Sequence, residues 1–434
     1  MAVDELTVLL EGRPIGSVER LANGALRLRY DEDYRDDPTA TLLSVSMPPA
    51  EEAHGEARLT PWLWGLLPDN ADVLARWSRD FGVSVASPFS LLSTQIGYDC
   101  AGAVQFCPAD QAEDLVTRPG EITLLTEAEV ALRLRVLRAD STSWLGPGFT
   151  GRFSLGGAQA KTALHYVDGD RKTRGQWGAP SGSVPTTHIL KPAIAGYEAQ
   201  HINEHLCLAA AAGLGLPAAN TRIERFEDES AIVVERFDRT IRDGALIRVH
   251  QEDLCQALSV PPARKYQTDG GPTPSQVAEL IRSTIPGPDA EVDVWRFADA
   301  LAFNWLIAGT DAHAKNYSLL LAGNQVRLAP LYDIASILPY DDSDGRDVKL
   351  AMKIGDDYKL RRTDRRSAWE HAADELKLDR EKLIARVLDL AQRTSAAFEK
   401  ALGDADLSEV SPDLPQRLVT LVSERSDHCQ ATLS

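Results

Sequence analysis

Hydrophobic and polar residues alternate in short runs near the start of the chain, which is the pattern of half-buried strands. Residues 25–30 read Ala-Leu-Arg-Leu-Arg-Tyr, with apolar side chains at nearly every second position. Two apolar runs, at residues 6–10 and 15–18, flank a short segment that contains glycine and proline. Apolar runs separated in this way predict two strands joined by a turn. The chain is therefore expected to begin with a group of short strands.

A helical spacing of apolar residues follows at residues 62–79. The sequence Pro68-Asp69-Asn70 interrupts this spacing and is a start signal for its second half. Residues 109–122 are polar and contain Pro119, so they suit a linker. Residues 1–110 are therefore predicted to form a small mixed unit of strands and helices.

The strand pattern returns after about residue 145. Apolar runs at residues 162–167 and 188–191 bracket a loop that is rich in glycine and proline. Residues 203–213 predict a helix that ends at glycine, and residues 221–226 and 230–234 predict a hairpin. Residues 145–256 are therefore expected to form a β-rich lobe.

From residue 257 onward the spacing is mainly helical. One predicted helix ends near Gly309, and its buried face carries Val294, Phe297, Leu301, Trp305 and Ala308. Another predicted helix carries apolar residues from Leu383 to Ala397. The expected fold class is thus α+β, with an N-terminal unit, a β-rich lobe and an all-helical lobe over residues 257–434.

Length and charge narrow the classes of function that suit this chain. It has 434 residues and a formal net charge of −18. This length exceeds what one hydrophobic core usually serves, so two or three domains are expected. An acidic chain is poorly suited to bind nucleic acid over its whole surface, because phosphate binding requires clustered lysine and arginine. If DNA is bound, a basic partner should supply most of the contact.

One basic patch is the local exception to the acidic balance. Residues 359–366 read Lys-Leu-Arg-Arg-Thr-Asp-Arg-Arg. Such a run is more often a solvated helix entry than a nucleic-acid contact. We therefore favour the first interpretation and keep contact with DNA as a hypothesis.

The five cysteines and the hydropathy pattern favour a cytoplasmic protein. The cysteines are scattered and form no Cys-x-x-Cys pair, which argues for a reducing compartment and against a disulfide framework or a zinc ribbon. No apolar run approaches the length that spans a bilayer, so no contact with a membrane is expected. The first residues lack the basic start and apolar core of a signal peptide.

The strongest candidate for chemistry is the stretch from Thr310 to Asn316. It places Asp311 five residues before Asn316, and a second carboxylate, Asp333, follows. Protein kinases use this order of groups: one aspartate orients the attacking hydroxyl, and an asparagine and a later aspartate hold magnesium. Aspartate and asparagine are also common in turns, so the spacing alone does not decide between the two interpretations.

Further candidate groups precede this stretch in the order that kinases require. Lys191 ends an apolar run and is suited to meet phosphates as a point charge. Glu204 lies thirteen residues later on the next predicted helix, where it is positioned in sequence to pair with Lys191. Each group alone is more simply a surface charge at the end of an element, but their order favours the functional interpretation.

Two backbone segments complete this set of candidates. Residues 151–162 are rich in glycine, which lets backbone N–H groups approach an anion, although the stretch fits neither a Walker A loop nor the kinase glycine loop. Residues 233–238 end a predicted strand where the two lobes join, and backbone groups of such a hinge can bind adenine. A tight turn and an ordinary edge strand are the simpler interpretations of these two segments.

A competing motif lies on the predicted helix. His201, Glu204 and His205 fit His-x-x-Glu-His, which is a zinc-peptidase pattern with two histidines on one helix face. The motif is short, and no second acidic motif is tied to it. A zinc site would also leave Asp311 and Asn316 without a role, so we disfavour this alternative.

Taken together, these stretches resemble the HipA toxin kinases. Two N-terminal segments, Leu66 to Asn70 and Ile96 to Val104, match the small first subdomain of that family. The other matching segments are Ser154 to Leu164, Thr186 to Pro192, Val234 to Arg239, His250 to Gln256, Lys265 to Pro272, Thr310 to Ser318 and Leu331 to Ile334. The resemblance covers nearly the whole chain in one order, so it is specific.

The resemblance implies a role for each candidate residue. Asp311 would be the catalytic carboxylate, Asn316 and Asp333 would hold Mg²⁺, and Lys191 would contact the phosphates of ATP. Ser154 matches the serine that the family autophosphorylates, which ejects its loop and inactivates the kinase. The other implied contacts with ATP are Gly156, Gly157, Ala158, Gln159, Ala160, Lys161, Glu235, Arg236, Phe237, His313 and Tyr332, and Ser154 belongs to the same loop.

The resemblance also implies a fold, a substrate and partners. The implied protein is a bacterial serine/threonine kinase. Its implied fold is two-lobed and protein-kinase-like, with an extra small N-terminal subdomain. The implied substrate is a serine of an aminoacyl-tRNA synthetase, most familiarly the glutamyl enzyme, so that translation stops and growth arrest or persistence follows. The implied partner is a HipB-like helix-turn-helix antitoxin that binds operator DNA. A co-repressor without kinase activity is the alternative, and the intact acidic set argues against it.

Overall fold

The computed structural model describes residues 4–118, 120–146, 153–169, 175–194, 196–341, 348–405, 407 and 413–434. The chain divides into two compact units, each built from several segments. Unit 1 comprises Met1–Pro192, Glu224–Ala263 and Leu319–Val326, and unit 2 comprises Ala193–Ile223, Arg264–Ser318 and Arg327–Ser434. No helix in the described ranges is long and apolar enough to cross a membrane.

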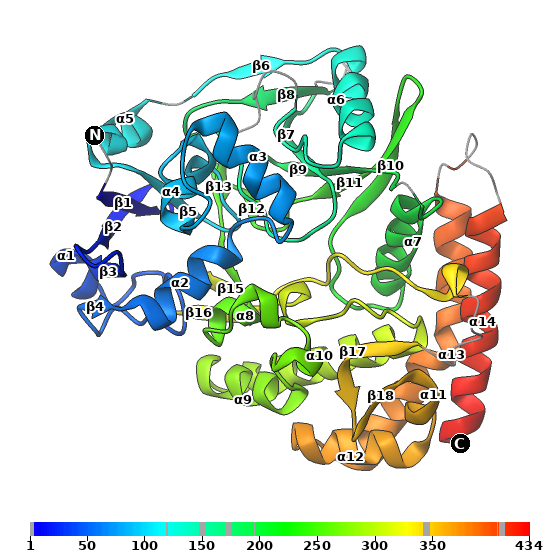
Figure 1. Cartoon of the computed structure of the whole chain (residues 1–434). Coiled ribbons are helices and arrows are strands. Elements are labelled where there is room, and N and C mark those ends of the chain that lie inside the picture. The colour runs from blue at the N-terminus through cyan, green and yellow to red at the C-terminus, as the bar shows by residue number, and fades with distance from the viewer. Residues whose placement is uncertain are drawn as a thin grey trace. The chain divides into compact units, whose positions relative to one another are not determined.

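The strands predicted near the N-terminus form the first sheet of unit 1, together with two that the pattern did not reveal (Figure 1). Their alternation has the expected effect: in the third strand Leu26, Leu28 and Tyr30 are buried, whereas Arg29 is exposed. Neighbouring strands are antiparallel throughout. The strand order is β4-β3-β2-β1-β5, with β1 (Glu5–Leu10), β2 (Arg13–Arg20), β3 (Leu26–Tyr30), β4 (Ala53–His54) and β5 (Val104–Pro108).

The helical spacing at residues 62–79 divides into two helices where the start signal predicts the break. Asn70 caps the second helix, because its side chain accepts hydrogen bonds from the backbone N–H groups of Asp72 (2.9 Å) and Val73 (3.3 Å). Losing such a cap costs about 1 kcal/mol. The four helices of this region are α1 (Glu32–Arg35), α2 (Glu56–Gly65), α3 (Ala71–Phe81) and α4 (Pro88–Leu92).

A second sheet of six strands contains the strands predicted for residues 162–191 and 221–234. Its order is β10-β11-β9-β7-β8-β6. The sequence pattern missed β8, which lies within the glycine-rich loop, and β6, which lies further upstream. The strands are β6 (Ile122–Leu124), β7 (Thr162–Val167), β8 (Gln176–Pro180), β9 (His188–Pro192), β10 (Thr221–Phe226) and β11 (Glu229–Glu235).

The linker predicted for residues 109–122 is wrong. A short helix, α5 (Ala112–Thr117), forms there because Leu115 packs on Leu9 and Cys107 of the first sheet. The helix α6 (Glu127–Ala139) follows and begins with a capping box between Thr126 and Glu129. Its apolar residues Val130, Ala131 and Leu134 share a core with Leu164, Leu190 and Val233 of the second sheet.

The remaining elements of unit 1 are short. Two of these strands pair with each other: β12 (Arg239–Arg242) and β13 (Ala245–Arg248). Another strand, β14 (His250–Asp253), precedes α8 (Leu254–Ala257). A three-stranded sheet has the order β14-β15-β16, with β15 (Ser318–Ala322) and β16 (Gln325–Leu328).

Unit 2 is mainly helical, and its predicted helices are present. The predicted helix that stops near Gly309 is α10, whose residues Val294, Phe297 and Trp305 are fully buried. The helix predicted from residue 203 is α7. The long helices are α7 (Gln200–Gly213), α9 (Pro274–Thr284), α10 (Asp289–Leu306), α12 (Arg366–Leu376), α13 (Arg380–Asp404) and α14 (Asp413–Leu433).

The α+β class is confirmed, but the part after residue 257 is not wholly helical. It contains β15 and β16 and a hairpin of β17 (Lys349–Ile354) and β18 (Asp357–Lys359). The hairpin turns at Gly355, which has a positive φ of 58° that favours glycine. A six-residue strand is too short for its period to be distinguished from a helix in the sequence.

The basic patch lies at the start of helices, as the simpler interpretation predicted. It covers the end of β18, α11 (Leu360–Thr363) and the start of α12. Arg362 is 3.2 Å from Asp357, and Arg366 forms ion pairs with Glu370 (3.0 Å) and Glu381 (2.7 Å). These carboxylates offset the charges of Arg362 and Arg366, two of the five basic residues of the patch.

Candidate active site

Asn316 brings the two predicted acidic segments of unit 2 together. Its side-chain nitrogen donates hydrogen bonds to the backbone oxygens of Asp311 (2.8 Å) and Asp333 (3.3 Å). Asn316 is buried, whereas the side chain of Asp311 is 65% exposed. Asp333 has a left-handed φ of 55°, which aspartate tolerates better than most residues. The spacing of these residues in sequence is therefore matched by proximity in space.

The side-chain oxygens of this cluster suit a magnesium ion. Because the Asn316 nitrogen is used by backbone oxygens, its side-chain oxygen is the atom that can coordinate a cation. Asp333 adds a carboxylate, and Mg²⁺ prefers oxygen ligands completed by substrate phosphates. Among the described residues no group of three or more His, Cys, Asp or Glu could hold a metal, so these two residues would need such additional ligands.

Helix α7 positions the segment that carries Asp333. Its Asn203 side chain donates to the backbone oxygen of Ser336 (2.7 Å) and accepts from the N–H of the same residue (3.0 Å). Just before Asp333, Leu331 N–H donates to Pro217 O, and Ala219 N–H donates to Leu331 O, both at 2.8 Å. The segment is thus hydrogen-bonded on both sides of Asp333.

A tyrosine that the sequence did not mark as functional contacts the candidate catalytic carboxylate. The hydroxyl of Tyr266 donates to a carboxylate oxygen of Asp311. The Tyr266 ring packs edge-on against His313, with ring centroids 4.9 Å apart. His313 Nε2 lies 3.8 Å from the same Asp311 oxygen. The sequence showed Tyr266 only as part of a matching segment, because nothing in its spacing links it to Asp311.

Tyr332 supports the same region from within unit 2. Its hydroxyl donates to the backbone oxygen of Lys315 (2.7 Å) and lies 2.6 Å from Ser318 Oγ. Tyr332 therefore links the segment of Asp333 to the segment of Asn316. Its predicted contact with ATP stays a prediction.

In unit 1, the predicted phosphate loop starts at a fully buried serine. Ser154 Oγ donates to the backbone oxygen of Leu66 (2.7 Å). Its backbone N–H donates to Asp99 O (2.8 Å), and its backbone oxygen accepts from Ala101 N–H (3.1 Å). Ser154 is thus held by two segments of the N-terminal region, one at the end of α2 and one before β5.

The rest of the loop curls around a buried lysine. Lys161 Nζ donates to Gly156 O (2.6 Å) and lies 4.8 Å from the centroid of the Trp144 ring. Gly157 has a φ of 95°, and a side chain there would come within 2.7 Å of Lys161 Nζ. Asp69 N–H donates to Gly157 O (3.0 Å). The exposed Ala158 and the half-buried Gln159 and Ala160 complete the turn.

Lys191 and Glu204 are both buried, on elements of different units. Lys191 lies on β9, where it pairs in register with Ile232 of β11, and is 5% exposed. Glu204 lies on α7 and is 2% exposed. Their predicted ion pair stays a prediction.

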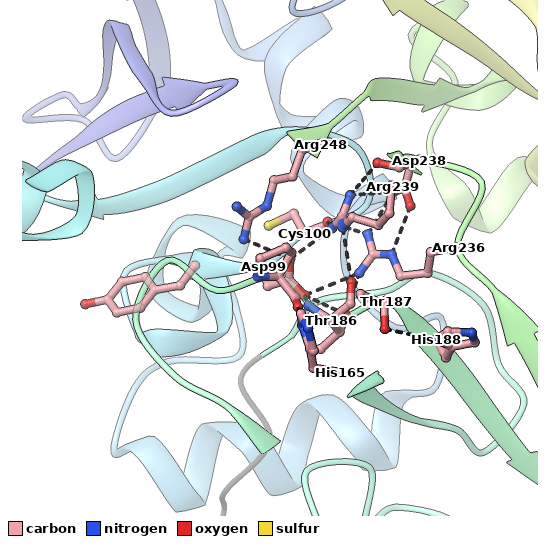
Figure 2. A network of polar contacts seen from close by, with 12 residues as sticks. Asp99, Cys100, His165, Thr186, Thr187, His188, Arg236, Asp238, Arg239 and Arg248 are labelled. Carbon is pink, nitrogen blue, oxygen red and sulfur yellow. Dashed lines mark hydrogen bonds and ion pairs between the residues drawn. The ribbon is translucent and has the colours of Figure 1, made fainter. Parts of the chain in front are cut away.

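The predicted hinge divides into different environments. Glu235 is exposed at the end of β11, and Phe237 is half-buried. Arg236 is buried instead, and its guanidinium contacts Asp238 (2.8 Å) and Asp99 (3.3 Å) (Figure 2). The backbone N–H of Arg236 donates to Thr187 O (2.9 Å). The Arg236 side chain therefore serves the internal structure of unit 1 rather than a ligand.

Arg236 belongs to a buried network of two aspartates and three arginines. Arg239 Nη2 lies 2.9 Å from an oxygen of Asp99, and Arg248 Nη2 lies 3.2 Å from the same oxygen. Burial raises the pKa of Asp99, but the three guanidinium groups outweigh it and hold the pKa below its ordinary value. Burial and the neighbouring Arg236 lower the pKa of Arg239 to about 10. Asp99 and Arg239 are therefore both charged at neutral pH.

The structure gives no support to the zinc alternative. His201 and His205 are both buried on α7, and burial lowers the pKa of each to about 4, so the imidazoles are neutral. His205 Nδ1 lies 2.8 Å from Thr221 Oγ1. In the ranges that the structure describes, no further group of ligands completes a zinc site around these two.

Two family models match the chain, that of the HipA N-terminal domain over residues 6–107 and that of the HipA-like C-terminal domain over residues 153–398. The chain is 36% identical over 406 residues to the putative kinase Y4mE of Sinorhizobium fredii, covering 93% of each chain. It is 30% identical over 366 residues to the serine/threonine-protein kinase toxin HipA of Shewanella oneidensis, covering 80% of this chain and 77% of that protein.

A solved structure extends the likeness to three dimensions. It contains HipA and HipB of Shewanella oneidensis MR-1 with their operator DNA. A chain of that complex matches the present one with a TM-score of 0.82 and 26% identity, covering 99% of this chain and 98% of that chain.

Proposed function

This chain belongs to the HipA family of serine/threonine-protein kinase toxins and has its kinase-like fold, and we propose that it phosphorylates a serine of an aminoacyl-tRNA synthetase. The glutamyl enzyme is the first candidate. The observation that carries the proposal is the bridge from Asn316 to Asp311 and Asp333, which assembles the acid and amide groups of a phosphotransfer site. Asp311 is the catalytic group in this proposal.

Asp311 orients the hydroxyl of the acceptor serine and accepts its proton. Its side chain is 65% exposed, so an acceptor can reach it from solvent. A positioned carboxylate of this kind contributes through orientation and proton transfer, because phosphoryl transfer needs little covalent help from the protein.

The nucleotide contacts in this proposal follow the roles that the resemblance implies. Asn316 and Asp333 would hold Mg²⁺, which neutralises charge on the phosphates when bound. Lys191 and the loop from Gly156 to Lys161 bind the phosphates of ATP, and backbone groups of Glu235 and Phe237 bind adenine. The guanidinium of Arg236 makes no nucleotide contact in this proposal, since it is held by Asp99 and Asp238.

Tyr266 holds the carboxylate of Asp311 in place, and this gives a first prediction. Replacing Tyr266 with phenylalanine should lower the phosphate-transfer rate about 10- to 100-fold, because a hydrogen bond to a charged group is worth about 1.5–3 kcal/mol. The KM for ATP should stay near its native value. Initial rates over a range of ATP concentrations measure both constants.

Tyr358→Phe is the matched control, because this half-buried tyrosine of β18 lies outside the acidic cluster. A native rate for Tyr266→Phe, or the same loss in both variants, would remove the role given to Tyr266.

Ser154 is the proposed site of autophosphorylation. Its buried hydroxyl donates a hydrogen bond to Leu66 O. A phosphate carries about −1.5 to −2 charges, so it cannot be accommodated in the buried position of the hydroxyl. The modified loop must therefore leave this position, which removes Gly156 to Lys161 from the nucleotide site. Phosphorylation of Ser154 would in this way switch the kinase off.

The proposed partner is a HipB-like antitoxin that binds operator DNA. HipB and operator DNA accompany the Shewanella HipA in its solved structure. The net charge of −18 supports contact with DNA mainly through such a partner. The toxin would block translation and arrest growth until the antitoxin neutralises it, and the pair would together repress its operon.

A panel of purified aminoacyl-tRNA synthetases from the source bacterium tests the proposed substrate. Each enzyme is incubated with the unphosphorylated kinase and Mg-ATP, and phosphopeptides are located by mass spectrometry. The proposal predicts a phosphoserine in one synthetase and loss of its aminoacylation activity. Labelling of Ser154 without labelling of any synthetase would contradict this substrate while leaving the kinase intact.

A further inference from the structure

Asp99 joins two parts of unit 1 that the two family models match separately. It lies in the segment matched by the N-terminal model, residues 6–107, whereas its partners Thr186, Arg236, Arg239 and Arg248 lie in the segment matched by the C-terminal model. Figure 2 shows these side chains converging on one buried point. The side chain of Asp99 is only 3% exposed.

Both carboxylate oxygens of Asp99 are engaged by the second segment. Oδ2 accepts from Thr186 Oγ1 (2.6 Å) and Thr186 N–H (3.0 Å) and lies 3.3 Å from Arg236 Nη1. Oδ1 accepts from Arg239 (2.9 Å) and Arg248 (3.2 Å). Asp99 is thus the point where these three arginines meet.

The backbone beside this carboxylate holds the serine of the phosphate loop. Asp99 O accepts from Ser154 N–H, and Ala101 N–H donates to Ser154 O. Cys100 and Ser154 form an isolated parallel bridge between these two contacts. Any shift of Asp99 therefore moves the strand partner of Ser154.

The same carboxylate holds the hinge. Arg236 stands between Glu235 and Phe237 in the sequence, and its guanidinium also donates to Cys100 O (2.9 Å). One short segment, residues 99–101, thus contacts both the hinge arginine and the serine of the loop.

We propose that Asp99 is a positioning residue that couples the adenine hinge to the Ser154 loop through the N-terminal region. This inference rests on the proposed function, because it takes the hinge and the loop as the two ends of the ATP site. Neither end touches the other in the contacts above; each is held by residues 99–101.

The charges explain why this coupling depends on Asp99. Three guanidinium groups face two carboxylates in a buried site, so the network already carries one excess positive charge. Without the Asp99 charge, Arg236, Arg239 and Arg248 would face Asp238 alone and repel one another. Separation of these arginines displaces the hinge and residues 99–101 together.

The coupling is reciprocal by thermodynamic linkage. ATP that bridges the hinge and the loop should stabilise the pairing of Ser154 with residues 99–101. When phosphorylation expels Ser154, Asp99 O and Ala101 N–H lose their partners. The N-terminal region should therefore respond to the state of the ATP site.

Asp99→Asn tests the coupling, with Asp293→Asn as the matched control. Asp293 is also a buried aspartate held by two arginines, Arg296 and Arg327, but it belongs to unit 2. The readouts are the melting temperature, the Kd for Mg-ATP from calorimetric titration, and hydrogen exchange of peptides that cover residues 99–104 and 153–161. Each is measured on the full, unphosphorylated chain.

We expect Asp99→Asn to weaken Mg-ATP binding about tenfold, equivalent to about 1.4 kcal/mol, and to speed exchange in both peptides. Asp293→Asn should lower the melting temperature without either effect. Thr186→Val, which removes one hydrogen bond to Asp99 and no charge, should give a smaller change of the same kind if Asp99→Asn does not fold.

Native Kd and native exchange in a destabilised Asp99→Asn chain would overturn the coupling, as would the same changes in Asp293→Asn. The proposed function fails separately, if the native chain binds no Mg-ATP or transfers no phosphate. In that case exchange at residues 153–161 alone decides whether Asp99 holds the Ser154 loop.

Discussion

Replacing Asp311 with asparagine will lower the rate of phosphate transfer by about 10²- to 10⁴-fold, the range that a positioned general acid or base contributes. The amide keeps the size of the side chain but neither accepts the proton nor attracts the acceptor hydroxyl as a carboxylate does. Because the Asp311 side chain is 65% exposed, the melting temperature should stay close to native. Transfer of labelled phosphate from Mg-ATP, measured before Ser154 becomes modified, gives the rate.

Asp389→Asn is the matched control for this experiment. Asp389 is a more than half-exposed aspartate of unit 2 that pairs with Arg393 on α13. The Asp389→Asn variant should transfer phosphate at the native rate. Equal activity in Asp311→Asn and the native chain would mean that the carboxylate of Asp311 takes no part in transfer.

Asp333→Asn is expected to have the second largest effect, about a hundredfold or more in rate, because charge stabilisation by a metal is worth several kcal/mol. The neutral amide would hold Mg²⁺ weakly, so the concentration of Mg²⁺ that gives half-maximal rate should rise. Asn316 should still bridge the two segments, since it donates to the backbone oxygen of residue 333 and not to its side chain.

The measurement is a titration of the transfer rate with Mg²⁺ at fixed ATP. Asp356→Asn serves as the control, because this exposed aspartate of unit 2 contacts only His371 among the ion pairs described. An unchanged Mg²⁺ dependence in Asp333→Asn would place the metal ligands elsewhere.

Much of the fold can be predicted from the sequence, because many of its strands and helices have an apolar face that is buried. The alternation at residues 25–30 follows from a sheet with one apolar side, and the apolar spacing of α10 belongs to a helix that is buried over most of its length. Short elements escape this reasoning. The strand β6 has three residues, and the helix α5 packs Leu115 on Leu9, which lies far away in sequence.

The candidate site likewise has a part that the sequence predicts and a part that it does not. The order of Asp311, Asn316 and Asp333 reveals the acidic set, because the spacing is local and the chemistry requires those groups. The contacts of Tyr266 and Asp99 cannot be predicted from the sequence. Asp99 and Arg239 are 140 residues apart, and no periodicity relates two charges that meet only after both segments have folded. For the same reason Arg236 resembles a hinge residue in sequence while its side chain is buried.

The most direct test of the kinase assignment is the mass of the chain before and after incubation with Mg-ATP. The protein is first shown to be unphosphorylated, and phosphopeptides are then mapped in the native chain and in Asp311→Asn. We expect one phosphate on Ser154 of the native chain and none on the variant. No phosphate on the native chain, or equal phosphate on both, would contradict it.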